Sequence, residues 1–188
     1  KGYFYQDPAN NDPLSLGGFS TLQGKQMSFN NLLDVSAGLE TIALIGKNEP
    51  ACVIIKHTNP CGAAVSKKLE EAFQKAWYDG DPLAAFGGVI VVNRTITSEF
   101  AEAMLADRKF FEVLVAPAFD EEALSVFSQK PKLQLWQNKV LEKPFLKEYE
   151  DIKKIRGGYL VQDGDIFEIT EKHFKVVTKQ KPTKEQVR

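Results

Sequence analysis

The sequence is poor in the residues that form disulfide frameworks and metal clusters. Its 188 residues include only two cysteines and two histidines. Cys52 falls inside an expected strand and Cys61 at an expected turn, and two cysteines are too few for a disulfide framework. Because disulfides are rare in reducing compartments, we take a cytoplasmic location as the expectation.

Strong charge and long apolar runs are also lacking. Lysine and arginine together number 24, and aspartate and glutamate 25, so the formal net charge is −1. This balance gives no electrostatic case for binding nucleic acid or an anionic membrane. No run approaches the roughly 18 apolar residues of a membrane span, and the first residues lack a signal-peptide pattern. We expect a globular protein with neither nucleic-acid nor membrane partners.

What the sequence does contain is an alternation of helix-like and strand-like segments. Ser28 is a suitable N-cap for the first helix, Gly46 a suitable end for it, and Thr97 a cap for another. Helices are expected at 29–45, 67–79, 98–108 and 120–129, and strands at 51–57, 89–92, 113–116, 133–136, 159–162 and 175–178, with a turn at 163–164 between the last two. The charged segment 138–156 is expected at the surface. The alternation predicts an α/β fold with a mostly parallel sheet covered on both faces.

The segment 51–64 is the candidate active site. Its β-branched run at 52–55 is typical of a buried strand, and four polar residues follow at 56–59. Residues 60–62 (Pro-Cys-Gly) predict a turn, from which the chain enters a helix-like stretch. Open α/β folds bind ligands where a strand ends in a turn to a helix, so we expect the site here.

Lys56 and His57 are the candidate catalytic pair. A histidine exchanges protons near neutral pH, and a lysine stabilises negative charge that develops on an acyl oxygen. Adjacent residues of a strand point to opposite faces, so both side chains serve one pocket only where the strand twists into the turn. The alternative is a strand end whose polar side chains are simply solvated.

Zinc binding and a cysteine nucleophile are two further hypotheses for this segment. Zinc deaminases need His-x-Glu and Pro-Cys-x-x-Cys, but position 59 is Asn and position 64 is Ala, so we expect metal-free chemistry. Cys61 paired with His57 is a second option, that of a cysteine hydrolase. The alternative is a small packed residue near a turn.

Two further segments carry candidate binding residues. Phe86 can stack on a planar heterocycle, and Gly87 allows a ligand to approach the backbone closely. The alternative is an ordinary turn with a core phenylalanine. Glu112 precedes an expected strand, where its carboxylate can accept hydrogen bonds from ligand hydroxyls; the alternative is a solvated linker residue.

Together these segments resemble the AICAR transformylase family, the formyl-transfer part of a bifunctional purine biosynthesis protein. Residues 56–64 match its Lys-His-x-x-Pro-x-Gly-Ala-Ala motif. Further matches follow the family's order along the chain, at 24–25, 30–34, 85–90, 112–117, 156–163 and 176–179. The resemblance extends over nearly the whole chain.

The resemblance implies a three-layer, cytidine-deaminase-like α/β subdomain over residues 1–188, without its zinc. It implies formyl transfer from 10-formyltetrahydrofolate to AICAR ribonucleotide, with His57 as proton acceptor and Lys56 as transition-state stabiliser. Phe86, Gly87, Glu112 and Asn59 would bind the nucleotide. The expected partners are therefore AICAR ribonucleotide, the folate and a second copy in a homodimer.

The family has parts that this sequence does not show. Its Arg-Tyr-Gly-x-Asn-Pro-His-Gln element is expected before Lys1, its second deaminase-like half after Arg188, and its IMP cyclohydrolase domain elsewhere. We therefore expect this chain, taken alone, to be the first half of the transformylase with little or no turnover. The rival hypothesis is a non-catalytic nucleotide-binding module, in which changes to Lys56 and His57 alter Kd and no reaction exists.

Overall fold

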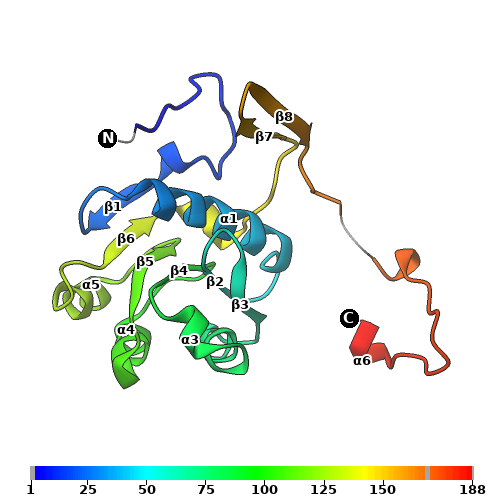
Figure 1. The fold of residues 1–188 in the computed structure, drawn as a ribbon. Coiled ribbons are helices and arrows are strands. Elements are labelled where there is room, and N and C mark those ends of the chain that lie inside the picture. The colour runs from blue at the N-terminus through cyan, green and yellow to red at the C-terminus, as the bar shows by residue number, and fades with distance from the viewer. Residues whose placement is uncertain (1–2, 168–169, 188) are drawn as a thin grey trace. The chain divides into compact units, whose positions relative to one another are not determined.

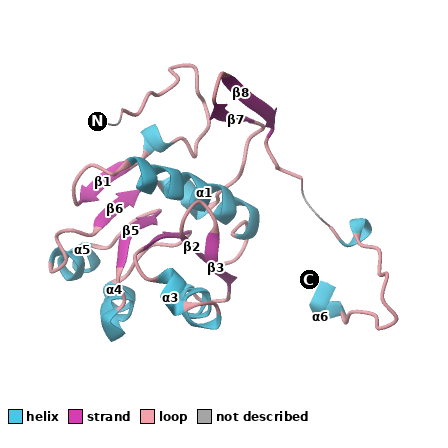
Figure 2. Cartoon of the chain, viewed as in Figure 1, coloured by secondary structure: helices cyan, strands magenta, loops and turns pink. Residues whose placement is uncertain are grey.

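The computed structural model describes residues 3–167 and 170–187. It consists of two compact units, Lys1–Leu146 and Lys147–Arg188, and each is described by itself (Figures 1 and 2). Across the described residues, no helix has the length and apolar character that a membrane crossing requires.

The first unit is built on a six-stranded sheet. The strands are β1 (Ser20–Gln23), β2 (Ala51–Ile55), β3 (Pro60–Val65), β4 (Gly88–Val92), β5 (Phe111–Ala116) and β6 (Gln134–Gln137), in the order β1-β6-β5-β4-β2-β3. The pairs β4–β5 and β5–β6 are parallel, and the other three pairs are antiparallel. Strands β3, β4, β5 and β6 therefore share one direction, which confirms a mostly parallel sheet, while β1 and β2 run against it.

Helices cover both faces of this sheet, as expected (Figure 1). The helices are α1 (Phe29–Ile45), α2 (Leu69–Gln74), α3 (Pro82–Ala85), α4 (Ser98–Leu105) and α5 (Glu121–Ser128), with a π-helical turn η2 (Lys75–Asp79) and 3-10 turns η1 (Leu16–Gly18), η3 (Ala106–Arg108) and η4 (Lys139–Glu142). On β2, Val53 and Ile55 pack with α1, whereas Cys52 and Ile54 pack with the helices of the opposite face. A strand that alternates between two cores in this way is the middle of three layers.

The expected helix boundaries are confirmed where capping chemistry defines them. The Ser28 hydroxyl accepts a hydrogen bond from the backbone N–H of Asn31, and the Asn31 side chain accepts one from the backbone N–H of Ser28. This reciprocal capping box starts α1 at Phe29, and Gly46 is its C-cap. Thr97 likewise caps α4.

The expected turn and helix at 60–64 are wrong. These residues form β3, which pairs antiparallel with β2 as a hairpin. A Cβ at Gly62 would lie 2.0 Å from the carbonyl oxygen of Ala76, so β3 packs directly on the backbone of η2. The absence of a side chain at Gly62 therefore permits a close strand-to-helix contact within β3.

The second unit contains a two-stranded antiparallel hairpin of β7 (Glu150–Ile155) and β8 (Gly158–Asp163), with a 3-10 turn η5 (Glu171–His173) and a short helix α6 (Lys184–Val187). The strand expected at 159–162 is confirmed, but its partner is the charged segment before it and not 175–178, which is not a strand. The turn expected between two strands at 163–164 is also wrong, because the strand expected after it does not form. Gly157, with φ +81°, lies between the two strands instead.

Candidate functional site

The polar residues 56–59 form the connection between β2 and β3. All five residues of β2 are buried, so the chain leaves the core and reaches the surface within this loop. The backbone N–H of Lys56 donates to the carbonyl of Asn59 at 2.9 Å. The carbonyl of His57 accepts bonds from the Thr58 hydroxyl at 2.7 Å and from the Asn59 amide at 3.3 Å. The loop is closed by its own hydrogen bonds, and its Lys56–His57 peptide is cis.

Lys56 joins this loop to the segment after α3. Its ammonium group donates to the carbonyl oxygen of Phe86. Gly87 has φ +76°, and a Cβ there would lie 3.3 Å from the Lys56 nitrogen. The structure thus brings together three of the residues predicted from the sequence, and a left-handed glycine lies against the lysine.

His57 and Asn59 are exposed at the same loop. The His57 ring makes no hydrogen bond to any residue within the described ranges, so both ring nitrogens are available to a ligand. The Asn59 side chain is held towards the loop by its bond to the His57 carbonyl.

Glu112 lies at the start of β5, which is separated from β2 by β4 in the sheet. Its carboxylate accepts a hydrogen bond from the side-chain amide of Asn31 at 3.2 Å. The preceding turn is tied to the Gly87 segment, because the backbone N–H of Gly87 donates to the carbonyl of Phe110 at 2.7 Å and the Phe86 and Phe110 rings lie 5.2 Å apart. Because Glu112 follows Phe110 by two residues, these contacts connect it to the Phe86–Gly87 segment that Lys56 contacts.

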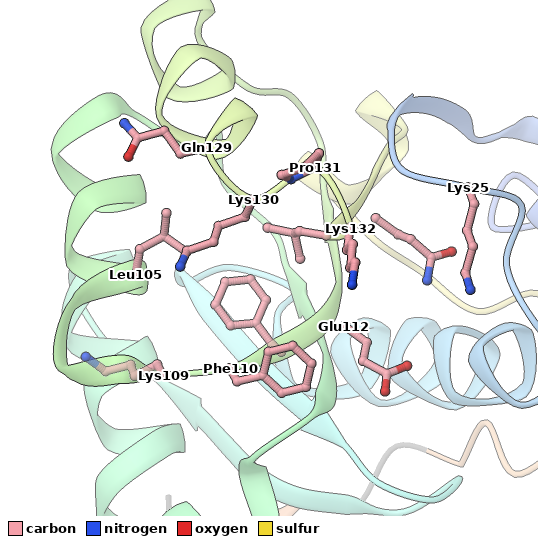
Figure 3. A pocket seen from close by; sticks show the side chains of 12 residues that line it. Lys25, Leu105, Lys109, Phe110, Glu112, Gln129, Lys130, Pro131 and Lys132 are labelled. Atoms are coloured by element: carbon pink, nitrogen blue, oxygen red, sulfur yellow. The ribbon is translucent and has the colours of Figure 1, made fainter.

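A pocket of about 780 Å³ lies beside Glu112, and sequence reasoning missed it (Figure 3). Its apolar wall comes from α4, the start of β5 and the α5–β6 connection. The lining residues are Lys25, Leu105, Lys109, Phe110, Phe111, Glu112, Gln129, Lys130, Pro131, Lys132, Leu133 and Gln134. Neither Lys56 nor His57 lines it, so Glu112 is the one predicted site residue that belongs to it.

The polar groups of this pocket are short of partners. Lys109 forms an ion pair with Asp107 at 3.2 Å. The side-chain ammonium groups of Lys25, Lys130 and Lys132 make no hydrogen bond or ion pair with any described residue. Gln134 is buried, and its side-chain oxygen has no hydrogen-bond partner among the described residues. Buried polar atoms are seldom left unpaired in folded proteins, so a ligand with a donor group is a natural partner here.

Two buried residues of α1 also reach the site and were not singled out from the sequence. Asn31 holds Glu112, and the Asp34 carboxylate accepts a hydrogen bond from the backbone N–H of Thr58 at 2.6 Å. They lie three positions apart, on the same side of the helix as buried Val35. A polar pair on an otherwise apolar helix face was the available sequence signal.

Cys61 is placed for packing. Its thiol donates to the carbonyl of Ile54 at 3.5 Å, and partial burial raises its pKa, so it is protonated at neutral pH. Within the described ranges, no three His, Cys, Asp or Glu side chains are grouped as ligands of a metal ion.

The family model of the AICARFT/IMPCHase bienzyme matches residues 1–188. The chain belongs to this family. The resemblance noted from residues 56–64 is confirmed at that level.

Two relatives show the extent of the match. The bifunctional purine biosynthesis protein PurH of Staphylococcus carnosus (strain TM300) is 46% identical over 175 residues, which cover 93% of this chain and 34% of the relative. PurH of Thermoanaerobacter sp. (strain X514) is 38% identical over 187 residues, which cover 100% of this chain and 35% of the relative. The chain therefore spans about a third of the length of these curated relatives.

Among solved structures, a putative formate dehydrogenase accessory protein from Desulfotalea psychrophila superposes with a TM-score of 0.42 at 10% identity, covering 71% of this chain and 62% of that one. This likeness is too low to support an argument. The assignment to the AICARFT/IMPCHase bienzyme family is carried by the sequence matches.

For this member of the AICARFT/IMPCHase bienzyme family, the geometry defines two kinds of chemistry. The 56–59 loop presents the exposed imidazole of His57, and the ammonium group of the preceding residue, Lys56, donates to the carbonyl of Phe86. These groups are suited to moving a proton and to stabilising an anion. The pocket beside Glu112 presents unpaired ammonium groups on an apolar wall, which suits an anionic ligand with an aromatic part.

Proposed function

We propose that this chain is part of an enzyme of purine biosynthesis that transfers a formyl group from 10-formyltetrahydrofolate to AICAR ribonucleotide. The names of its PurH relatives support the pathway. The observation that carries the proposal is the link from Lys56 to Phe86 and Gly87, beside the exposed ring of His57.

The reaction requires a proton acceptor and an anion stabiliser. The 5-amino nitrogen of AICAR attacks the formyl carbon, and His57 accepts the proton that this amine loses. The carbonyl oxygen becomes negative in the tetrahedral intermediate, and the Lys56 ammonium stabilises that charge. When the bond between the formyl carbon and N10 of the folate breaks, N10 takes up a proton and tetrahydrofolate leaves.

The nucleotide binds across the same surface. Phe86 and Gly87 contact the base, with Asn59 at the loop, and Glu112 accepts hydrogen bonds from ribose hydroxyls. The unpaired lysines beyond Glu112 then receive the phosphate, because ammonium groups without competing partners are the strongest local attraction for a dianion. Formyl transfer by these residues needs no metal ion.

We further assign residues 1–188 to the first, cytidine-deaminase-like subdomain of the transformylase region, without zinc. The rest of the site then comes from the remaining two thirds of a protein of PurH length and from the second subunit of a homodimer. We place this enzyme in the cytoplasm. The chain by itself is expected to show little or no turnover.

The test uses the full-length protein and its two histidines within this chain. With AICAR and 10-formyltetrahydrofolate as substrates, tetrahydrofolate release is followed spectroscopically. His57→Ala is expected to lower kcat by roughly 10²–10⁴-fold, the usual contribution of a general base. The matched control is His173→Ala in the second unit, which is expected to retain the activity of the parent.

Three outcomes contradict the proposal. Full-length protein that binds AICAR but shows no formyl transfer points to a nucleotide-binding module. A near-normal kcat for His57→Ala removes that residue as the base. Equal losses in both histidine variants mean that the effect is not specific to the 56–59 loop.

A further inference from the structure

Asp34 is a buried carboxylate whose hydrogen bond goes to the backbone of the candidate catalytic loop. Its side chain is only 6% exposed, and it accepts from the Thr58 N–H at 2.6 Å. Within the described part of the chain, no lysine, arginine or histidine pairs with it. Burying a polar side chain with a backbone N–H as its described partner is costly for the fold alone, so this placement calls for a reason beyond packing.

The loop that Asp34 contacts contains a residue in an unfavourable backbone conformation. Thr58 adopts φ +57°, in the left-handed region that β-branched residues seldom occupy. Such a backbone conformation costs of the order of 1–3 kcal/mol and persists only where its surroundings impose it. The internal bonds of the loop involve the carbonyls of His57 and Asn59, whereas the bond from Asp34 is, among the described residues, the one that reaches Thr58 from another element.

Asp34 also belongs to an element that serves the other side of the site. One turn earlier on α1, Asn31 donates to Glu112 and is itself fixed by the capping box with Ser28. The first turns of α1 therefore hold Glu112 through one residue and the 56–59 loop through another. A single rigid helix sets the spacing between a proposed nucleotide contact and the proposed catalytic pair.

We propose that Asp34 is a positioning residue for formyl transfer. By holding the Thr58 N–H, it fixes the loop in the conformation that directs the neighbouring His57 and Lys56 at the substrate. The catalytic part of this inference rests on the proposed function; the anchoring of the loop does not. If the hydrogen bond of Asp34 served only to stabilise the fold, its removal would lower the free energy of unfolding and leave the kcat of the folded enzyme unchanged.

The experiment compares Asp34→Ala with Asp34→Asn in the full-length protein. Asparagine keeps an oxygen that can accept from Thr58, whereas alanine removes it. We expect kcat to fall about 100-fold in Asp34→Ala, in the range seen when reacting groups are misplaced by about an ångström, and no more than about tenfold in Asp34→Asn. KM for the nucleotide should change less than about threefold in both, because neither variant removes a proposed nucleotide contact.

A second measurement follows the anchor without using activity. Hydrogen exchange of the Thr58 amide should be slow in the parent and in Asp34→Asn, and fast in Asp34→Ala. Thr58→Gly is the control: glycine suits the positive φ and keeps the N–H, so its amide should stay protected. Urea unfolding of each variant verifies that the protein measured is folded.

The outcomes separate the two hypotheses. Protection lost in Asp34→Ala together with the kcat loss, rescued by asparagine, supports the positioning role. A folded Asp34→Ala with kcat within about threefold of the parent overturns it. So does an equal kcat loss in both variants, or a Thr58 amide that exchanges fast in the parent. If the parent shows no formyl transfer, the proposed function fails while the exchange data still decide whether Asp34 anchors the loop.

Discussion

The loop at 56–59 and the pocket beside Glu112 both present lysines, but they hold them differently. The Lys56 ammonium group donates a hydrogen bond to the Phe86 carbonyl, and its loop is fixed by internal hydrogen bonds and by a hydrogen bond to Asp34. Lys25 and Lys132 line their pocket without a partner among the described residues. A fixed ammonium group suits a transition state, where geometry decides the rate, whereas a free one suits binding of a charged group. Under the proposed function, changes in the 56–59 loop should therefore lower kcat, whereas changes to the pocket lysines should raise KM.

The comparison is tested most strongly by removing the fixed lysine. Lys56→Met keeps the length of the side chain and removes its charge. We expect kcat to fall by about 10²–10³-fold, the usual loss for one group that stabilises an oxyanion, with a smaller change in KM for AICAR. Steady-state kinetics of the full-length protein measure both constants.

Lys56→Arg is the control for this change, because it keeps the charge but alters the geometry. It should recover part of the lost rate. If Lys56→Met raised KM and left kcat unchanged, the loop lysine would be a binding residue and the contrast between the two regions would be wrong.

Removing the free lysines should have the opposite kinetic pattern. In Lys25→Ala and Lys132→Ala, we expect KM for AICAR to rise about tenfold each, which corresponds to about 1.4 kcal/mol per contact, with little change in kcat. The effect should weaken at high salt, because exposed ion pairs are screened. Lys67→Ala, an exposed lysine outside the pocket, should leave both constants unchanged.

This prediction also identifies the ligand end that enters the pocket. The nucleoside without its phosphate should bind the parent and the two variants equally well. A loss of nucleoside binding in the variants, or a changed KM for the folate in place of the nucleotide, would show that the pocket receives something other than the phosphate.

Much of this arrangement was predictable, because it depends on local signals. The capping residues Ser28 and Thr97 defined two helices, and the β-branched run at 89–92 defined the buried strand β4. The motif at 56–64 indicated the family, which the family model confirms. In the structure Lys56 contacts the Phe86–Gly87 segment.

The parts that were not predictable depend on contacts between distant segments. The strand at 60–65 contains glycine and alanine, which have low strand propensity, and the glycine at 62 is explained by the close approach of η2. The pocket is formed by residues 25, 105, 109–112 and 129–134, and no local pattern shows that these segments meet. The role of Asp34 depends on a hydrogen bond across 24 positions of the chain.

The buried side chain of Gln134 gives a smaller test of the pocket. Its side-chain oxygen has no partner among the described residues, and such an atom costs about 1–3 kcal/mol. Gln134→Met removes the unpaired atom at similar volume, so we expect the free energy of unfolding to rise by about 1 kcal/mol in urea titrations while KM for AICAR also rises. Gln137→Met, at the other end of β6, should do neither. Higher stability with unchanged KM would mean that Gln134 does not meet the ligand.

The smallest expected effect concerns the thiol of Cys61, on β3. Cys61 follows the 56–59 loop, but burial raises the pKa of its thiol, and the thiol already donates to the carbonyl of Ile54. A protonated thiol is a poor nucleophile, and serine can make the same hydrogen bond. We therefore expect Cys61→Ser to keep kcat and KM within about twofold of the parent values, since a change away from the reacting groups alters energies by about 0.5 kcal/mol or less. A loss of more than about 100-fold, with the protein still folded, would place the nucleophile at Cys61 and reduce Lys56 and His57 to supporting roles.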